Sequence, residues 1–306
     1  MGSPRVERRT RWGVYLKALR LDRWPRSLAV LPGWVLALVW HRRPWEGSAL
    51  GALVGAYLAT LGVSIFNYVL NEVTDAPYDA HHPVKRGRPV VQGRVSVGGL
   101  MGLGWVALGT GFLVGHWLSP YAWLPLLFLA IAGFLYNVPP RTKDVPYLDA
   151  LTEAINQPIR FLIGWFSVVT WGWDWPSPWV LAAVWAFSAF LMYTKRLAEK
   201  LSLPEVQAVL YRRSLGAYSK GRLVACIVGS GIATLVALAG AALHLGRPRL
   251  WLLLPGVAVY ALWIYRQATR HPYYSDEPEA LFRRPVFLVL TGLLAVGALW
   301  ALQQGT

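Results

Sequence analysis

The chain has 306 residues, of which 55% are hydrophobic and only 15% charged, and its net charge is +15. Because soluble domains carry about a quarter charged residues, this composition argues against a soluble protein. We attribute the positive charge to orientation in a membrane and contact with anionic lipid rather than to nucleic-acid binding. The single cysteine, Cys226, lies in an apolar run, so we expect a small buried hydrophobe and no disulfide within the chain.

Apolar runs long enough to cross a bilayer, about 18 residues or more, recur along the whole chain. In order they are 27–41, 48–70, 96–117, 119–136, 147–171, 178–194, 222–244, 250–266 and 284–302. Short polar or proline-containing breaks divide 96–136 and 222–266, as in helical hairpins. We therefore predict one all-α integral membrane domain, residues 1–306, with nine transmembrane helices.

The Lys and Arg residues predict how these helices are oriented. Most of the 30 lie in the N-terminal segment and in the loops after the second, fourth, sixth and eighth runs, whereas the opposite loops hold only Arg42, Arg43, Arg247 and Arg249. Since positive loops stay inside, we expect a multi-pass protein of the cell (inner) membrane. Residues 1–26 lack the features of a cleaved signal peptide and are expected to be a cytoplasmic basic segment.

An acidic motif follows the second run, on the side predicted to be cytoplasmic. Asn71, Asp75 and Asp79 are spaced i, i+4, i+8, which places them on one face of a helix. Oxygen groups beside hydrocarbon are costly unless a cation lies among them, and Mg²⁺ binds one or two carboxylates together with phosphate oxygens. We therefore predict a Mg²⁺-bound diphosphate here. The alternative is a solvated helix end with Asp79 exposed, because Pro77 can end the helix early.

A basic, turn-rich stretch comes next. Lys85, Arg86 and Arg88 would be ordinary cytoplasmic charges on their own. Beside carboxylates, Lys85 and Arg88 become candidates for neutralising the charge on a leaving diphosphate. His82 has three open roles: contact with substrate, acceptance of a proton, or ordering of the loop.

The fifth run begins with a stripe of polar residues. Asp149, Glu153, Gln157 and Arg160 are spaced i, i+4, i+8, i+11, again one face of a helix. Asp149 is the natural second metal ligand, directed at the same pocket as Asp75. The others are candidate substrate-binding residues, because an ionisable group inside a span is a functional hypothesis by default. The alternative for Arg160 is a structural ion pair with Glu153.

Two further basic pairs follow the sixth run. Lys195 lies at the membrane border, where it and Arg196 are candidate phosphate ligands. Arg212 and Arg213 are interpreted as part of a solvated loop. The catalytic candidates of the whole chain are Asp75, Asp79, Asp149 and His82, and the candidate metal ligands are Asn71, Asp75, Asp79 and Asp149.

These residues make the chain resemble the UbiA superfamily of intramembrane prenyltransferases. The first motif of that family, Asn-Asp-x-x-Asp-x-x-x-Asp, matches 71–79 with Glu72 in place of the first Asp, and Asp149-x-x-x-Glu153 resembles the second. The resemblance implies a nine-helix bundle with a cytoplasm-facing active-site cavity. Within the superfamily the chain is most similar to the decaprenyl-phosphate phosphoribosyltransferase group, through residues 79–89, 195–199, 213–219 and 276–279.

The resemblance and the motifs together imply a Mg²⁺-dependent transferase with a diphosphate leaving group. The leading interpretation is phosphoribosyl transfer from phosphoribosyl diphosphate to a polyprenyl phosphate, because the candidate cations outnumber what one diphosphate needs. The alternative is prenyl transfer from a polyprenyl diphosphate to an aromatic, quinone-type or other small acceptor. A more remote alternative is a non-enzymatic lipid or ion transporter, since ionisable groups in spans also mark ion pathways.

Overall fold

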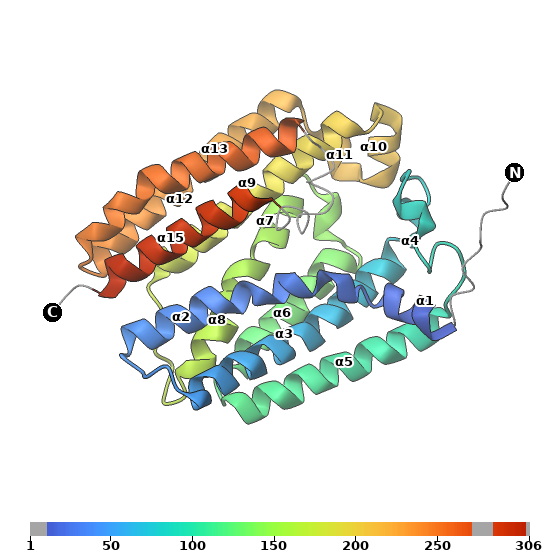
Figure 1. Cartoon of the computed structure of the whole chain (residues 1–306). Helices are drawn as coiled ribbons and strands as arrows, with labels where there is room; N and C mark the ends of the chain where they lie inside the picture. The colour runs from blue at the N-terminus through green and yellow to red at the C-terminus, as the bar shows by residue number, and fades with distance from the viewer. Residues whose placement is uncertain (1–10, 271–283, 304–306) are drawn as a thin grey trace, which may run out of the picture.

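The computed structural model describes residues 11–270 and 284–303, and every regular element among them is helical (Figure 1). The predicted similarity at residues 276–279 lies outside the described residues. The elements are α1 (Arg11–Ala18), η1 (Leu21–Val30), α2 (Leu31–Trp40), α3 (Gly47–Thr74), α4 (Ala76–Asp79), η2 (Lys85–Gly87), α5 (Val97–Leu118), α6 (Trp123–Asn137), η3 (Thr142–Asp144), α7 (Leu148–Ala154), α8 (Asn156–Val168), α9 (Pro178–Ser202), α10 (Glu205–Tyr211), α11 (Arg213–Ala217), α12 (Lys220–His244), η4 (Pro248–Leu252), α13 (Leu253–Arg270) and α15 (Pro285–Gln303).

Six helical segments are long and apolar enough to cross a membrane: α3, α5, α9, α12, η4–α13 and α15. The shorter apolar helix α6 covers the fourth predicted run. The first and fifth runs form η1–α2 and α7–α8, each built from two pieces. The all-helical membrane architecture is therefore confirmed, while the count of nine spans stays a prediction.

Prolines explain two breaks that bear on the site. Pro77 lies in the first turn of α4, directly after α3 ends at Thr74, as its missing N–H and fixed φ favour. Pro158 lies in the first turn of α8, just after α7 ends at Ala154. The fifth run is thus not the continuous helix expected, and its polar stripe is divided between α7 and α8.

Glycines allow helix backbones to touch at two crossings. A Cβ on Gly164 of α8 would lie 1.9 Å from the carbonyl oxygen of Val30, and one on Gly33 of α2 would lie 1.9 Å from that of Phe161. Gly62 of α3 approaches α5 in the same way, with a Cβ that would lie 2.9 Å from the Cα of Gly111. Small residues are the usual device for close helix packing in membranes.

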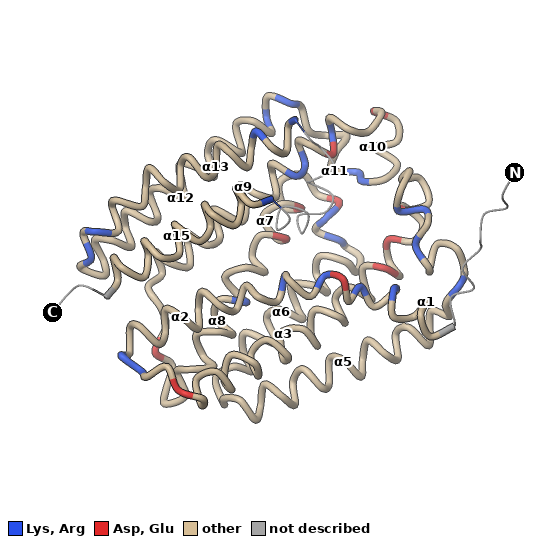
Figure 2. Tube along the Cα trace, viewed as in Figure 1, with Lys and Arg blue, Asp and Glu red and all other residues tan. Residues whose placement is uncertain are grey.

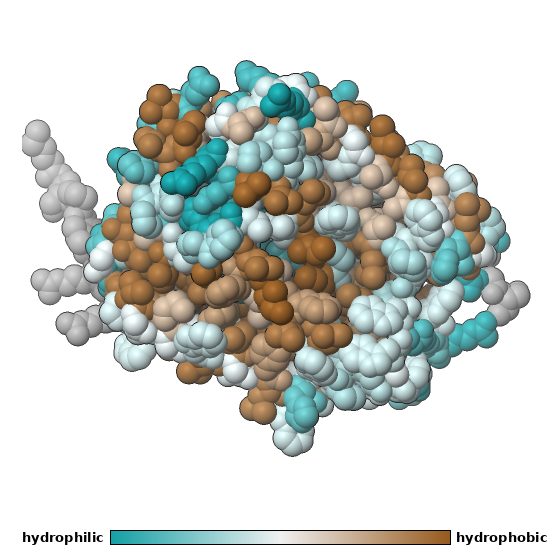
Figure 3. All heavy atoms as spheres, turned by 180° about the vertical axis from the view of Figure 1, so that it is seen from behind, coloured by the Kyte–Doolittle hydropathy of each residue, from teal (hydrophilic) through white to brown (hydrophobic). Residues whose placement is uncertain are grey.

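The surface agrees with a membrane environment. Figure 3 shows hydrophobic residues spread broadly across the middle of the rear face, and α5, α12 and α15 expose large apolar side chains such as Val106, Ile232 and Leu293. Charged residues gather at the end of the bundle that carries α1, α4, α10 and α11, with only a few at the opposite end (Figure 2). An apolar belt with charges at one end is expected of a multi-pass membrane protein.

Candidate active site

The first acidic motif lies at the charged end of the bundle, where the end of α3 meets the loop after α6. Lys143 Nζ lies 2.5 Å from Asp75 Oδ1, and Arg141 lies 3.3 Å from the same oxygen. Asn71 Nδ2 donates to Asp75 Oδ2 at 2.8 Å. Asn137 Oδ1 accepts from both Asn71 (2.9 Å) and Lys143 (2.8 Å). Asp75 is therefore held by three donors, one from the preceding turn of α3 and two from the loop after α6.

The charged groups of this cluster shift one another's pKa values. Burial by itself would raise the pKa of Asp75, but Lys143, Arg212 and Arg141 outweigh it and lower that pKa. Burial lowers the pKa of Lys143 to about 8, against the opposing attraction of Asp75. An ionised carboxylate thus faces a buried ammonium, both of them groups that bind a metal-diphosphate.

Asp79 is buried beside the same cluster. It forms an ion pair with Arg88, and burial raises its pKa despite that partner. The alternative of an exposed Asp79 at a solvated helix end is therefore wrong. Glu72, also buried, faces Arg20 and Arg88 at 3.7 Å each. The motif is thus divided between two sets of partners: Asn71 and Asp75 contact the end of α6 and the loop after it, whereas Glu72 of α3 and Asp79 of α4 pair with Arg88.

His82 organises the loop that follows α4. Its Nδ1 accepts from the backbone N–H groups of Val84 and Lys85, each at 3.2 Å. Its ring lies 4.7 Å from the ring of Tyr211 on α10, and the Lys85 ammonium also contacts Tyr211. Of the three predicted roles for His82, these contacts directly support ordering of the loop. They also place the ammonium of Lys85 against α10 at the rim of the site.

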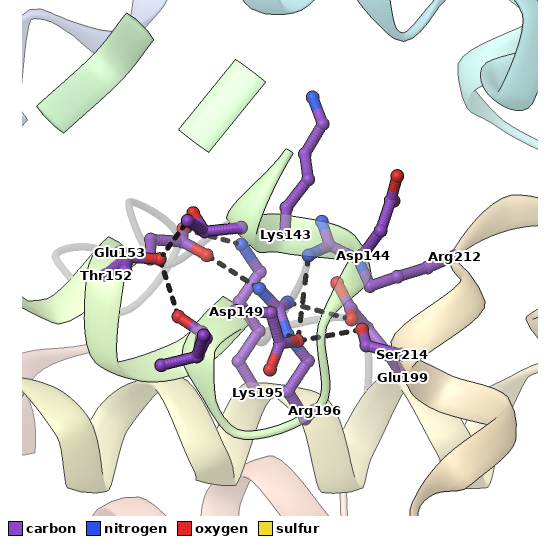
Figure 4. A network of polar contacts seen from close by, with 12 residues as sticks. Lys143, Asp144, Asp149, Thr152, Glu153, Lys195, Arg196, Glu199, Arg212 and Ser214 are labelled. Atoms are coloured by element: carbon purple, nitrogen blue, oxygen red, sulfur yellow. Dashed lines mark hydrogen bonds and ion pairs between the residues drawn. The ribbon is translucent and has the colours of Figure 1, made fainter. Parts of the chain in front are cut away.

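The second acidic motif surrounds one fully buried arginine (Figure 4). Arg196 of α9 contacts Asp149 at 2.8 Å, Glu153 at 2.7 Å and Glu199 at 3.0 Å. Lys195, its neighbour in sequence, lies 3.4 Å from Glu153. The carboxylates of α7 are therefore bound to α9 through charge-assisted hydrogen bonds.

The segment α10–α11 folds back over this cluster. Ser214 and Tyr218 donate to Asp149 at 2.9 and 2.5 Å. Arg212 donates to the hydroxyl of Tyr136 at 3.0 Å, with 11% of its side chain accessible. The prediction of a solvated Arg212 is therefore wrong, because the loop returns to the bundle, whereas Arg213 is exposed as expected.

Tyr136 and Arg212 join the two clusters. The hydroxyl of Tyr136 donates to Glu153 at 3.0 Å, and its ring centroid lies 5.6 Å from the Lys143 ammonium. Arg212 acts electrostatically on Asp75 as well as on the Asp149 network. The two acidic motifs, far apart in sequence, therefore meet in one polar region at the charged end of the bundle.

The fit of this region to Mg²⁺ rests on its donor atoms. Within the described residues no group of three or more His, Cys, Asp or Glu stands ready to hold a metal. Carboxylate oxygens of Asp75 and Asp79 and the amide oxygen of Asn71 are nevertheless the hard ligands that Mg²⁺ prefers, and two carboxylates suffice when phosphate oxygens complete the shell. The residues fit the ion, and the full ligand set with Asp149 stays a prediction.

Gln157 and Arg160 lie on α8, deeper along the bundle. Gln157 is half-buried in the first turn, and Arg160 is 7% exposed. The alternative of an Arg160–Glu153 ion pair is not realised, because Glu153 is paired with Lys195 and Arg196. The break between α7 and α8 separates the two residues.

Comparison with known proteins decides the family. A profile of the UbiA prenyltransferase family matches residues 28–291. The chain belongs to this family. A search of curated protein sequences finds no match.

Solved structures of other proteins, two of them UbiA homologues, share the fold. A UbiA homologue from Archaeoglobus fulgidus bound to GPP and Mg²⁺ superposes with a TM-score of 0.70 at 19% identity, covering 95% of this chain and 99% of that one. The apo UbiA homologue from Aeropyrum pernix K1 gives 0.64 at 16% identity, covering 90% and 98%. A digeranylgeranylglyceryl phosphate synthase gives 0.62 at 11% identity, covering 96% and 99%. The predicted family is thus confirmed, and with it a UbiA-superfamily transferase.

Proposed function

We propose that this UbiA-family enzyme transfers a group from a diphosphate donor, with the diphosphate as leaving group, in the region between Asp75, Asp79 and Asp149. The observation that carries the proposal is the buried ammonium of Lys143 against Asp75, with Arg141, Arg88 and Arg212 close by. Mg²⁺, held by Asp75, Asp79 and Asn71 with Asp149 as the second-motif ligand, would supply charge neutralisation on the leaving diphosphate. The Archaeoglobus fulgidus homologue bound to GPP and Mg²⁺ supports this assignment.

The protein's own cations supply the remaining charge. Lys143, Arg88, Lys85 and Lys195 are the residues that would contact the phosphate oxygens, because preorganised donors of this kind stabilise developing negative charge. Arg196 is fully buried among three carboxylates, so it holds the second motif in place. The predicted orientation puts this polar end at the cytoplasmic face of the cell membrane.

The leading donor is phosphoribosyl diphosphate and the leading acceptor a polyprenyl phosphate. Besides Arg196, six basic residues border the two clusters, namely Lys85, Arg88, Arg141, Lys143, Lys195 and Arg212. A diphosphate and a phosphorylated acceptor together bring more negative charge than a prenyl diphosphate and a neutral acceptor, which favours the phosphoribosyl reaction. The second candidate, prenyl transfer to a small acceptor, is favoured by the homologues bound to GPP and DMAPP.

One incubation separates these candidates. Purified protein in detergent is given radiolabelled phosphoribosyl diphosphate, Mg²⁺ and polyprenyl phosphate, and we expect label to enter the organic phase together with release of pyrophosphate. An Asp75→Asn variant is the matched control without product. Turnover of a prenyl diphosphate with an aromatic acceptor, and no labelled lipid, would replace the leading candidate by the second. Absence of pyrophosphate from every donor would favour the transporter.

A further inference from the structure

Three elements that pack against one another carry buried polar atoms without a hydrogen-bond partner. They include the Oγ atoms of Ser27 and Ser64, Oδ1 of Asn67 and Asn156, the hydroxyl of Tyr68, and Nε of Arg160. These residues belong to η1, α3 and α8, and each pair of these elements is in contact. Buried polar atoms in folded proteins are nearly always paired, so such a concentration requires an explanation.

The helix crossings bring these residues to one level of the bundle. The close approach of Gly164 to Val30 fixes η1 against α8. Arg160 lies one turn before Gly164, and Ser27 lies one turn before Val30. Arg160 and Ser27 therefore lie at about the same height along the bundle. Tyr68 of α3 and Arg26 of η1 are close enough to act electrostatically on Arg160. Ser27, Tyr68 and Arg160 therefore lie at a common level, whereas Asn67 faces α6, where its Nδ2 donates to Leu129.

This region is separate from the carboxylates but continuous with them. Tyr68 precedes Asp75 by seven residues on α3, a rise of about 10 Å. Between the two levels, Glu153 and Lys195 keep 20% and 14% of their side chains accessible although helices surround them. Arg26 acts electrostatically on Glu153 and Lys195 as well as on Arg160, so the two regions adjoin each other.

The charge of Arg160 indicates what this region binds. Within the described residues Arg160 forms no salt bridge and donates no hydrogen bond, and it is 7% exposed. Arg26 adds a second positive charge nearby, and the carboxylate that acts on Arg160, Glu153, is already paired with Lys195 and Arg196. A guanidinium stays charged in proteins, and a cation within a span needs a counter-charge. Water would satisfy the hydroxyls and amides but would not balance this charge, whereas an oxyanion does both.

We propose that Arg160, with Tyr68, Asn156 and Ser27, forms an acceptor subsite that binds the oxyanionic head group of the second substrate while the diphosphate donor occupies the carboxylate clusters. This inference rests on the proposed function, because it assumes a diphosphate at Asp75. The head group is a phosphate if the acceptor is a polyprenyl phosphate and a carboxylate if the acceptor is an aromatic acid. The guanidinium fork suits either anion.

The test is direct binding to the full-length protein in detergent. Isothermal titration measures the affinities for farnesyl phosphate, for 4-hydroxybenzoate and for Mg²⁺ with pyrophosphate, each in wild type, Arg160→Gln and Tyr68→Phe. We expect Arg160→Gln to weaken one of the two acceptor probes by about 10- to 100-fold, as loss of a hydrogen bond to a charged group does, and to leave Mg²⁺–pyrophosphate affinity unchanged. Which probe responds identifies the phosphate or carboxylate source.

Further variants separate binding from folding. Arg160→Lys keeps the charge and is expected to retain more acceptor affinity than Arg160→Gln. Arg222→Gln removes an exposed arginine at the start of α12 and is the matched control. If neither acceptor probe binds, or if both bind to Arg160→Gln as to wild type, the subsite is refuted. Equal loss of pyrophosphate affinity would assign Arg160 to the donor site or to folding and would also overturn it. Failure of the wild type to bind Mg²⁺–pyrophosphate would instead count against the proposed function.

Discussion

Arg196 offers the sharpest test of the buried network. Its guanidinium lies 2.8, 2.7 and 3.0 Å from Asp149, Glu153 and Glu199. At about 3 Å and an effective dielectric constant of about 20, each pair contributes about 5 kcal/mol of attraction. Withdrawal of the arginine from water opposes this by several kcal/mol. Replacement by methionine keeps much of the volume but leaves carboxylates without their main partner, so we expect a loss of about 3–5 kcal/mol in the free energy of unfolding.

The assay follows unfolding of the detergent-solubilised protein by the fluorescence of its 17 tryptophans. Arg222→Met, at an exposed position, is the control and should unfold like wild type. Glu199→Gln should be less harmful in the Arg196→Met background than alone, with a coupling of about 0.5–3 kcal/mol. An Arg196→Met protein that unfolds at the wild-type midpoint would refute the argument.

Three further predictions concern the metal, the phosphate contacts and the packing. Asp75→Asn should lower turnover by about 10²–10³-fold, while circular dichroism should show that its helical content is retained. EDTA should abolish the activity of the wild type until Mg²⁺ is restored. Full activity in EDTA would contradict the assignment of a Mg²⁺ site. Lys143→Met should weaken pyrophosphate binding about 10-fold or more in a titration, and unchanged binding would remove Lys143 from the donor site. Gly164→Ala places a Cβ 1.9 Å from the Val30 carbonyl oxygen and should cost at least about 1–3 kcal/mol in unfolding, whereas Gly172→Ala, with nothing within 4 Å, should be neutral.

The hydrophobic runs were sufficient to locate the long apolar helices, but not the short helices α1, α4, α10 and α11. Every run of bilayer length contains helix in the structure, because a chain in lipid must satisfy its own backbone hydrogen bonds. The breaks between α3 and α4 and between α7 and α8 were harder to predict. Pro77 was recognised as a possible helix end, but the spacing of Asp149, Glu153 and Arg160 was interpreted as one face of a continuous helix. Pro158 divides that stripe, so Arg160 takes a separate environment on α8.

The acidic residues of the site were predictable and most of their partners were not. Asp75 and Asp149 stand out because carboxylates beside hydrocarbon are rare. Their partners Lys143, Arg212 and Tyr218 lie in loops or short helices. In the sequence, Lys143 and Arg212 look like ordinary cytoplasmic charges, and nothing marks Tyr218 as a partner of Asp149. Which loop cation turns inward depends on how α10–α11 and the loop after α6 fold back, and that depends on contacts between segments more than 60 residues apart, such as Lys143 with Asp75 and Arg212 with Tyr136.

Lys195 and Arg196 are adjacent in sequence but differ in burial and in their contacts. Both were predicted to bind phosphate, but neighbouring positions on a helix point about 100° apart. Arg196 is fully enclosed, and its Nε, NH1 and NH2 atoms all donate to carboxylates, which leaves it little to offer a substrate. Lys195 keeps accessible surface and a single long contact to Glu153 at 3.4 Å. A flexible ammonium can leave such a contact for a phosphate oxygen, whereas a guanidinium bound by three carboxylates cannot do so without breaking the network. In this pair Arg196 is therefore a fixed support for the second acidic motif, and we expect Lys195 to be the one that binds substrate phosphate.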